Sequence, residues 1–135
     1  MIQSLLPTAK AICAYTLLFA IPLVSPPSGE KKMKMLKKVE AMKEEIEKQI
    51  WVGSSIQSAK KTMERNGFKC IFIERGSFAE MADEERFVRR HDNADFLYCD
   101  KEKGGFICSR RWQVAIVHHD GIVSDIFVSI SQTCP

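Results

Sequence analysis

The chain of 135 residues is long enough for one domain, and its 45% hydrophobic and 27% charged residues are typical of a globular protein. Because Lys10 is the sole charged side chain in residues 1–29, the remainder carries 19 lysines and arginines against 17 acids. That near balance gives no electrostatic case for nucleic-acid binding, which usually needs a clustered basic face, so no nucleic-acid partner is expected.

The N-terminal residues 1–29 have the pattern of a targeting segment. The uncharged run AICAYTLLFAIPLV covers residues 11–24, and SPPSGE follows it. The run suits the apolar region of a signal peptide and is short for a spanning helix, which needs about 20 residues. We favour a cleaved signal peptide; an uncleaved anchor and a buried soluble helix are the alternatives. We therefore expect export to the periplasm, envelope or medium, with membrane association through residues 2–24 if the segment is retained.

Lysines close to the apolar run favour another topology. Five lysines lie between residues 31 and 38, whereas only Lys10 and the amino terminus precede the run. Positive charge tends to remain on the cytoplasmic side of a membrane. An anchored chain would then face inward, as a membrane-tethered adaptor.

Four cysteines lie outside the leader: Cys70, Cys99, Cys108 and Cys134. An even number in a small exported domain allows two disulfides, with three connectivities. No pair has CxxC spacing, which disfavours a zinc ribbon or a thioredoxin-like motif. If bridges form, Cys99–Cys108 would close a hairpin and Cys70–Cys134 would tie the first strand to the tail. Four reduced thiols in a reducing compartment are the alternative.

Residues 30–50 are expected to form an amphipathic, charged helix ahead of a small α+β domain at residues 51–135. Lys and Glu dominate the sequence KKMKMLKKVEAMKEEIEKQI, and apolar residues recur at spacings of four, three and four. The helix either packs on its own domain or forms a short coiled coil or membrane-surface helix. Its apolar stripe comprises Met35, Val39, Met42 and Ile46.

A second helix has clear signals at both ends. Ser54 and Gln57 have the spacing of a capping box at its start. Asn66-Gly67 supplies the left-handed residue that ends a helix, and Phe68 is placed to pack back on the last turn. The apolar face of this helix comprises Ile56, Ala59 and Met63.

Four apolar or β-branched segments predict strands at residues 68–74, 94–100, 106–119 and 122–130. The polar residues 75–93 between the first two are expected to form a long surface loop, with a helical turn near its middle. The fold class is therefore α+β, with one or two helices packed on a four-stranded antiparallel meander in two layers.

The stretch HHDG, which begins at His118, is the one place that resembles a catalytic or metal-binding signature. If His118 pairs with Ile122, a three-residue loop accounts for the Asp and the Gly, and His118 and His119 point to opposite sides of the strand. We therefore interpret HHDG as a hairpin corner and expect no metal, cofactor or catalytic residue. The rival interpretation is a small metal-binding protein or hydrolase-type enzyme that uses His118, His119 and Asp120, with His91 as a further group.

The same pairing predicts the two faces of the hairpin. The expected core face comprises Trp112, Val114, Ile116, Ile122, Ile126 and Val128. The opposite face would carry an apolar patch of Val117, Val123 and Phe127 unless something covers it. Arg111, Trp112 and Phe127 are the candidate contact residues for a partner, and Trp112 is also a candidate for the core.

The helix entry VGS at residues 52–54 and the helix end NGF at residues 66–68, placed before a meander, resemble the SmpA/BamE-like group of small exported proteins. That group shares a helix-helix-sheet layout with the β-lactamase-inhibitor-protein fold. The resemblance implies a binding or scaffold module of the cell envelope and supplies no catalytic residues. We accordingly expect a non-enzymatic module whose partner is another protein.

Overall fold

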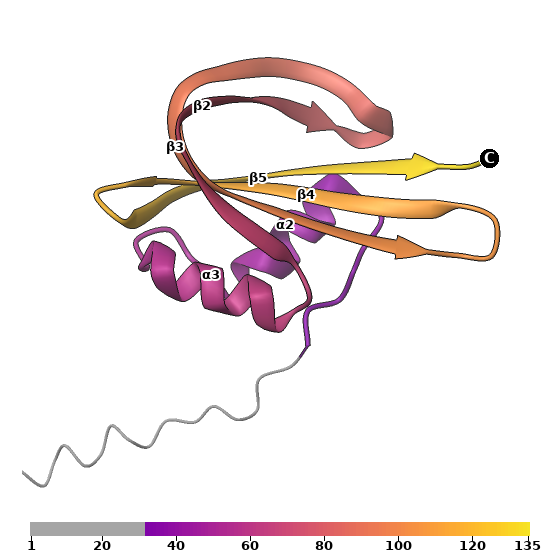
Figure 1. Cartoon of the computed structure of the whole chain (residues 1–135), viewed down its shortest axis with the longest axis horizontal. Helices are drawn as coiled ribbons and strands as arrows, with labels where there is room; N and C mark the ends of the chain where they lie inside the picture. Colours follow the sequence, from indigo (N-terminus) through magenta and orange to yellow (C-terminus); the bar gives the residue numbers. More distant parts are fainter. Residues whose placement is uncertain (1–31) are drawn as a thin grey trace, which may run out of the picture. The chain divides into compact units, whose positions relative to one another are not determined.

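The computed structural model of the chain describes residues 32–135, so the leader predicted at residues 1–29 lies outside the described residues. Met33–Pro135 form one compact unit (Figure 1). The α+β class and the four-stranded antiparallel sheet, in the order β2-β3-β4-β5, are confirmed. The elements are α2 (Val39–Glu47), α3 (Ile56–Arg65), β2 (Lys69–Ala82), the 3-10 turn η1 (Asp83–Glu85), β3 (Arg86–Gly104), β4 (Ser109–His119) and β5 (Ile122–Thr133).

The first helix is shorter than predicted, because residues 33–38 form an extended strap instead of helical turns. The backbone N–H groups of the strap bond to side chains: that of Met33 donates to Asn66 Oδ1 at 2.8 Å, and that of Lys34 donates to Glu45 Oε2 at 2.9 Å. These tertiary hydrogen bonds replace the i→i−4 bonds of a helix. Helix α2 belongs to the same compact unit as the sheet, which agrees with the alternative that it packs on its own domain.

The second helix begins one residue later than predicted. The Ser55 hydroxyl, not that of Ser54, accepts from the backbone N–H groups of Gln57 and Ser58. The predicted end is confirmed, because Gly67 has a φ of 90° and the N–H of Phe68 returns to the carbonyl of Met63 at 3.1 Å.

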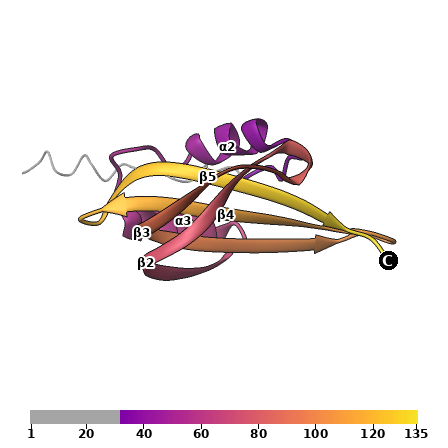
Figure 2. The ribbon, with the colours of Figure 1, turned by 90° about the horizontal axis from the view of Figure 1, so that it is seen from above.

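One hydrophobic core joins both helices to the inner face of the sheet, and α2 lies beside β5 (Figure 2). The apolar faces predicted for the two helices are buried in it, except Met35, which lies in the strap and is half-buried. From the helices and the strap it contains Met33, Val39, Met42, Ile46, Ile50, Ile56, Ala59, Met63 and Phe68. From the sheet it contains Leu97, Cys99, Trp112, Val114, Ile116, Val123, Ile126, Val128 and Ile130.

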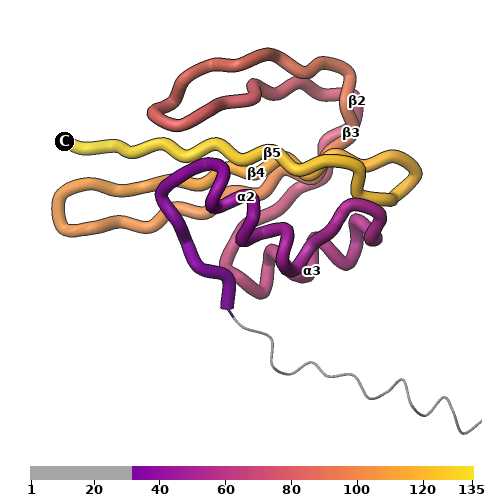
Figure 3. The backbone as a smooth tube through the Cα atoms, turned by 180° about the vertical axis from the view of Figure 1, so that it is seen from behind, coloured from indigo at the N-terminus to yellow at the C-terminus, as the bar shows by residue number. Residues whose placement is uncertain are grey.

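The loop predicted at residues 75–93 is wrong, because this segment is a β-hairpin, which we call the arm. Strands β2 and β3 continue through it and meet at η1. Figures 1 and 3 show the arm curling back over β5, on the side of the sheet away from the helices. None of its side chains belongs to the main core. Its sequence therefore lacks the apolar pattern of a core strand and has the composition of a polar loop.

The base of the arm is bent by irregular backbone on both strands. Arg75 and Asn93 have φ values of 48° and 56°, and the Arg75 N–H donates to Asp95 Oδ1 at 2.8 Å. At Gly76, an added Cβ would overlap the Ile73 side chain. A glycine is therefore required where the two strands turn over the sheet.

The β4–β5 hairpin has a two-residue turn instead of the predicted three-residue loop. His119 pairs with Ile122, and Asp120 and Gly121 have φ values of 54° and 79°, as a type I′ turn requires. The register then shifts, because Ser124 is an extra residue that forms a bulge. The bulge turns both Val123 and Ile126 into the core and leaves Ile122 exposed, so the expected positions of Val123 and Ile122 are exchanged.

Candidate ligand-binding site

The outer face of the sheet, which is the face away from the helices, is roofed by the arm. Phe78 lies at the centre of the contact, with ring centroids 4.9 Å from Phe96 and 5.3 Å from Phe127. Phe96 is buried by this contact, and Phe127 is half-buried. Of the outer patch predicted from the sequence, Phe127 lies under the arm, whereas Val123 is in the main core instead.

A cavity of about 380 Å³ lies between the arm and the outer face. Its volume falls within the range of small-molecule pockets, which starts near 300 Å³. The arm contributes Phe78, Ala79, Met81 and Glu85, and the sheet contributes Tyr98, Gln113, Val114, Ala115, Phe127, Val128, Ser129 and Ser131.

The cavity has mostly apolar walls and a short polar row. Gln113 Nε2 donates to the Tyr98 hydroxyl, and Ser129 is the neighbour of Gln113 across the strand pair. Of the described residues that line it, only Glu85 is charged. The site could therefore surround an apolar molecule, bond to one polar group of it, and favour a neutral or cationic species over an anion.

His91 is held in the arm between two aromatic rings. Its ring stacks on Phe78 at 4.8 Å and lies 4.7 Å from Phe127, while Nε2 is 2.9 Å from Glu80 Oε1. Arg89 Nε lies 3.3 Å from the same carboxylate oxygen. This set of contacts fixes the arm on the sheet. In a hairpin, Phe78 and His91 lie on facing strands. The sequence could have indicated this contact only if residues 75–93 were assumed to form a hairpin.

The three predicted contact residues do not share a surface. Trp112 is buried in the core, where its Nε1 donates to the Leu36 carbonyl at 2.7 Å. Arg111 lies on the opposite face and forms an ion pair with Asp100, at 2.7 Å between Nε and Oδ1. This ion pair raises the pKa of the Arg111 guanidinium. Phe127 alone belongs to the cavity.

The HHDG residues form a hairpin corner. Asp120 lies in the turn, His119 is exposed, and His118 lies edge-on to Phe72 with ring centroids 6.1 Å apart. Within residues 32–135, no three His, Cys, Asp or Glu side chains are grouped closely enough to hold a metal ion. His91 instead pairs with Glu80, so the structure does not bring the rival set of residues together.

The four cysteines pair differently from the connectivity drawn from the sequence. Cys108 and Cys134 form a disulfide, which ties the start of β4 to the C-terminal tail. Cys70 and Cys99 are directly opposite on β2 and β3, with sulfur atoms 2.7 Å apart and no covalent bond. The Cys70 hydrogen bond and burial raise the pKa of the Cys99 thiol far above its usual range.

Exposed apolar side chains gather at two ends of the sheet. Trp51 and Val52, in the α2–α3 loop, are 61% and 60% exposed, and backbone hydrogen bonds tie this loop to the β4–β5 hairpin beside exposed Ile122. At the other end, Phe106 and Ile107 form the tip of the β3–β4 hairpin and are exposed.

None of the helices in the described part of the chain is long and apolar enough to span a membrane.

Comparison with protein-family models, with curated proteins and with solved structures found no match to this chain.

Proposed function

We propose that this chain is a non-enzymatic, exported binding module that holds a small apolar molecule in the cavity beneath the arm. The observation that carries the proposal is the cavity itself, with apolar walls and the Tyr98–Gln113 pair. Small-molecule sites have this composition, in which apolar side chains supply affinity and a few polar groups set orientation.

The chemistry of the lining defines the ligand class. Phe78, Met81 and Phe127 would contact the apolar body, while Tyr98 and Ser129 would bond to one polar end. The Glu85 carboxylate disfavours an anion. The ligand is therefore a compact, mainly apolar molecule that is neutral or positively charged.

In this proposal the sheet separates two tasks. The helices form a second layer on the inner face and supply stability, because their buried side chains share the main core. The outer face and the arm form the ligand site. The arm is the outer wall of this site, and the contacts of Phe78 with Phe96 and Phe127 hold it on the sheet.

Export is supported by the Cys108–Cys134 disulfide, because disulfides persist in oxidising compartments. Intact mass of protein recovered from its host, before and after reduction, tests this part. Loss of the leader together with a disulfide would agree with export. A full-length chain with free thiols would contradict it and favour the inward-facing tether.

The ligand site is tested with the neutral dye N-phenyl-1-naphthylamine, whose fluorescence rises in apolar surroundings. We expect saturable binding that Ser129→Phe abolishes, because the ring fills the cavity from the sheet side. Thr133→Phe, on the exposed end of the same strand, is the matched control and should bind as the wild type does. Equal binding by all three proteins would contradict the proposal.

A protein partner is the second candidate, and the exposed Trp51, Val52 and Ile122 favour it. Tryptophan is enriched at the centres of protein interfaces. A photo-crosslinking residue at position 51 should capture a defined partner in the native host, whereas the same residue at position 61, on the exposed face of α3, should not. Absence of a crosslink specific to position 51 would exclude this surface.

A further inference from the structure

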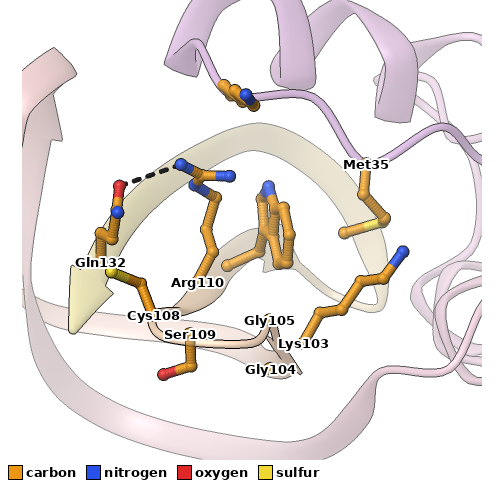
Figure 4. A pocket seen from close by; sticks show the side chains of 10 residues that line it. Met35, Lys103, Gly104, Gly105, Cys108, Ser109, Arg110 and Gln132 are labelled. Carbon is orange, nitrogen blue, oxygen red and sulfur yellow. Dashed lines mark hydrogen bonds between the residues drawn. The ribbon is translucent and has the colours of Figure 1, made fainter. Parts of the chain in front are cut away.

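A second pocket, of about 310 Å³, lies at the far end of the core, where the strap crosses the β3–β4 hairpin (Figure 4). Its walls include the Trp112 side chain, Met35 and the bridged Cys108. The remaining lining residues are Lys37, Lys103, Gly104, Gly105, Ser109, Arg110 and Gln132.

All charged side chains among these lining residues are cationic. They are Lys37 from the strap, Lys103 from β3 and Arg110 from β4. None of the three takes part in the ion pairs recorded among residues 32–135, which instead occupy other cations such as Arg111 and Lys48. The pocket therefore concentrates positive charge without a carboxylate in its wall.

Lys103 and Arg110 are two like charges in a position where a bound anion would contact both. The two residues are direct partners across β3 and β4, and like charges in directly opposite positions destabilise a sheet. Arg110 donates from Nη2 to Gln132 Oε1 at 2.9 Å, which leaves its other guanidinium N–H groups available (Figure 4). A phosphoryl group would satisfy both cations at once.

An acidic turn adjoins the pocket on one side. Asp83, Glu84 and Glu85 line a neighbouring hollow that also touches Lys37 and Arg110, and Glu85 Oε2 accepts from the Gln132 N–H at 3.5 Å. These carboxylates lower the positive potential at Lys37 and Arg110, but they do not line the pocket itself. Lys103 lies outside that hollow.

The hairpin that supplies Lys103 also carries the most exposed apolar pair. Phe106 is fully exposed and Ile107 is 63% exposed, and the backbone bond from Gly105 N–H to the Cys108 carbonyl, at 2.7 Å, holds them at the tip. Apolar side chains next to basic ones are typical of surfaces that lie in the interface of an anionic bilayer.

We propose that this end of the domain docks on an anionic phospholipid surface. The headgroup phosphate occupies the pocket between Lys103, Arg110 and Lys37, and Phe106 and Ile107 enter the boundary with the acyl chains. The pocket provides the charge, and the hairpin tip provides the apolar contact. This inference is independent of the cavity beneath the arm.

Co-sedimentation of the full chain with phosphatidylcholine vesicles, with and without phosphatidylglycerol, tests the docking. The leader is common to all variants, so differences between variants report on the pocket. We expect phosphatidylglycerol to strengthen binding and the double variant Lys103→Ala/Arg110→Ala to weaken it roughly 30-fold, since each basic residue near an anionic surface contributes about fivefold. Lys61→Ala/Lys69→Ala removes the same charge from exposed positions elsewhere and should bind as the wild type does.

Two further measurements distinguish docking on a lipid surface from binding of a free phosphate compound. Phe106→Ser/Ile107→Ser should lose vesicle binding while keeping the melting temperature of the wild type. Soluble glycerol phosphate, followed by Trp112 fluorescence in the Trp51→Phe background, should bind weakly. Tight glycerol phosphate binding without vesicle binding would overturn the lipid assignment, and so would equal losses in the two lysine-containing double variants.

Discussion

Trp112 Nε1 donates a hydrogen bond of 2.7 Å to the main-chain carbonyl of Leu36. This contact joins residues 76 positions apart and holds the strap against the inner face of the sheet. The bond also satisfies the indole N–H of Trp112, which is buried on the core face of β4.

Trp112→Phe should destabilise the fold by about 1–3 kcal/mol, because the Leu36 carbonyl would lose its partner and the smaller ring would leave space in the core. Thermal unfolding measures the loss, and limited trypsin digestion should show faster cleavage within the strap. Trp51→Phe is the matched control, since Trp51 is 61% exposed. Equal effects of the two substitutions would refute the structural role of the Trp112 bond.

Glu45 should make the fold sensitive to acid. The carboxylate is only 7% exposed, and the Lys34 backbone N–H, followed by Lys48, lowers its pKa. A lowered pKa contributes stability that is present above the pKa of the unfolded chain and is lost as pH falls through that of the folded chain. Glu45→Gln should therefore cost about 1–2 kcal/mol at neutral pH.

Denaturant titrations at neutral and acidic pH check this prediction. The difference between wild type and Glu45→Gln should shrink on acidification, because both proteins then carry a neutral side chain. Glu47→Gln, at an exposed position on the same helix, should show no comparable pH dependence. A difference that stays constant with pH would contradict the role of the charge.

Cys70 and Cys99 should form a second disulfide in an oxidising compartment, because their sulfur atoms are already within 2.7 Å. In the reduced protein, the Cys99 thiol should react slowly with iodoacetamide. Cys99 is buried, and its raised pKa keeps it protonated at neutral pH. Peptide mapping after alkylation, with and without prior reduction, distinguishes the two states. Rapid labelling of Cys99 in the folded, reduced protein would be incompatible with this arrangement.

Gly76→Ala should displace the arm. The added Cβ would overlap Ile73 and come within 3.3 Å of the Phe96 ring, at an expected cost of about 1–3 kcal/mol. Gly76→Ala should also weaken dye binding in the cavity, because the bend at this residue sets the distance between the arm and the sheet. Gly104→Ala is the control, since a Cβ there meets no atom within 4 Å. An unchanged unfolding curve for Gly76→Ala would show that the bend tolerates a side chain.

Capping residues and apolar periodicity in the sequence predicted those features of the fold that depend on neighbouring residues. The helix end at Asn66-Gly67, the presence of four antiparallel strands and, apart from Met35, the apolar helix faces are confirmed. The register of the last hairpin was wrong because the turn is one residue shorter than expected and the bulge at Ser124 exchanges the positions of Ile122 and Val123. Alternation of apolar residues cannot reveal such a shift without the tertiary contacts that stabilise it.

The candidate site was missed for a related reason. Residues 75–93 have the composition of a loop, and only the stacking of Phe78, His91 and Phe127 across different strands gives the arm its position. Phe127 was selected from the sequence, but its partner surface is within the chain. The SmpA/BamE-like resemblance stays a prediction.

The arm has a consequence for self-association. Strand β5 is the last strand of the sheet, and an uncovered edge strand is a template for pairing with another copy of the chain. The acidic turn at the end of the arm prevents this at one place, because Glu85 occupies the outward N–H of Gln132. On the other edge, bulges along β2 interrupt the regular row of donors and acceptors. The hairpin that builds the cavity thus also leaves each edge of the sheet with an interruption in its row of free donors and acceptors.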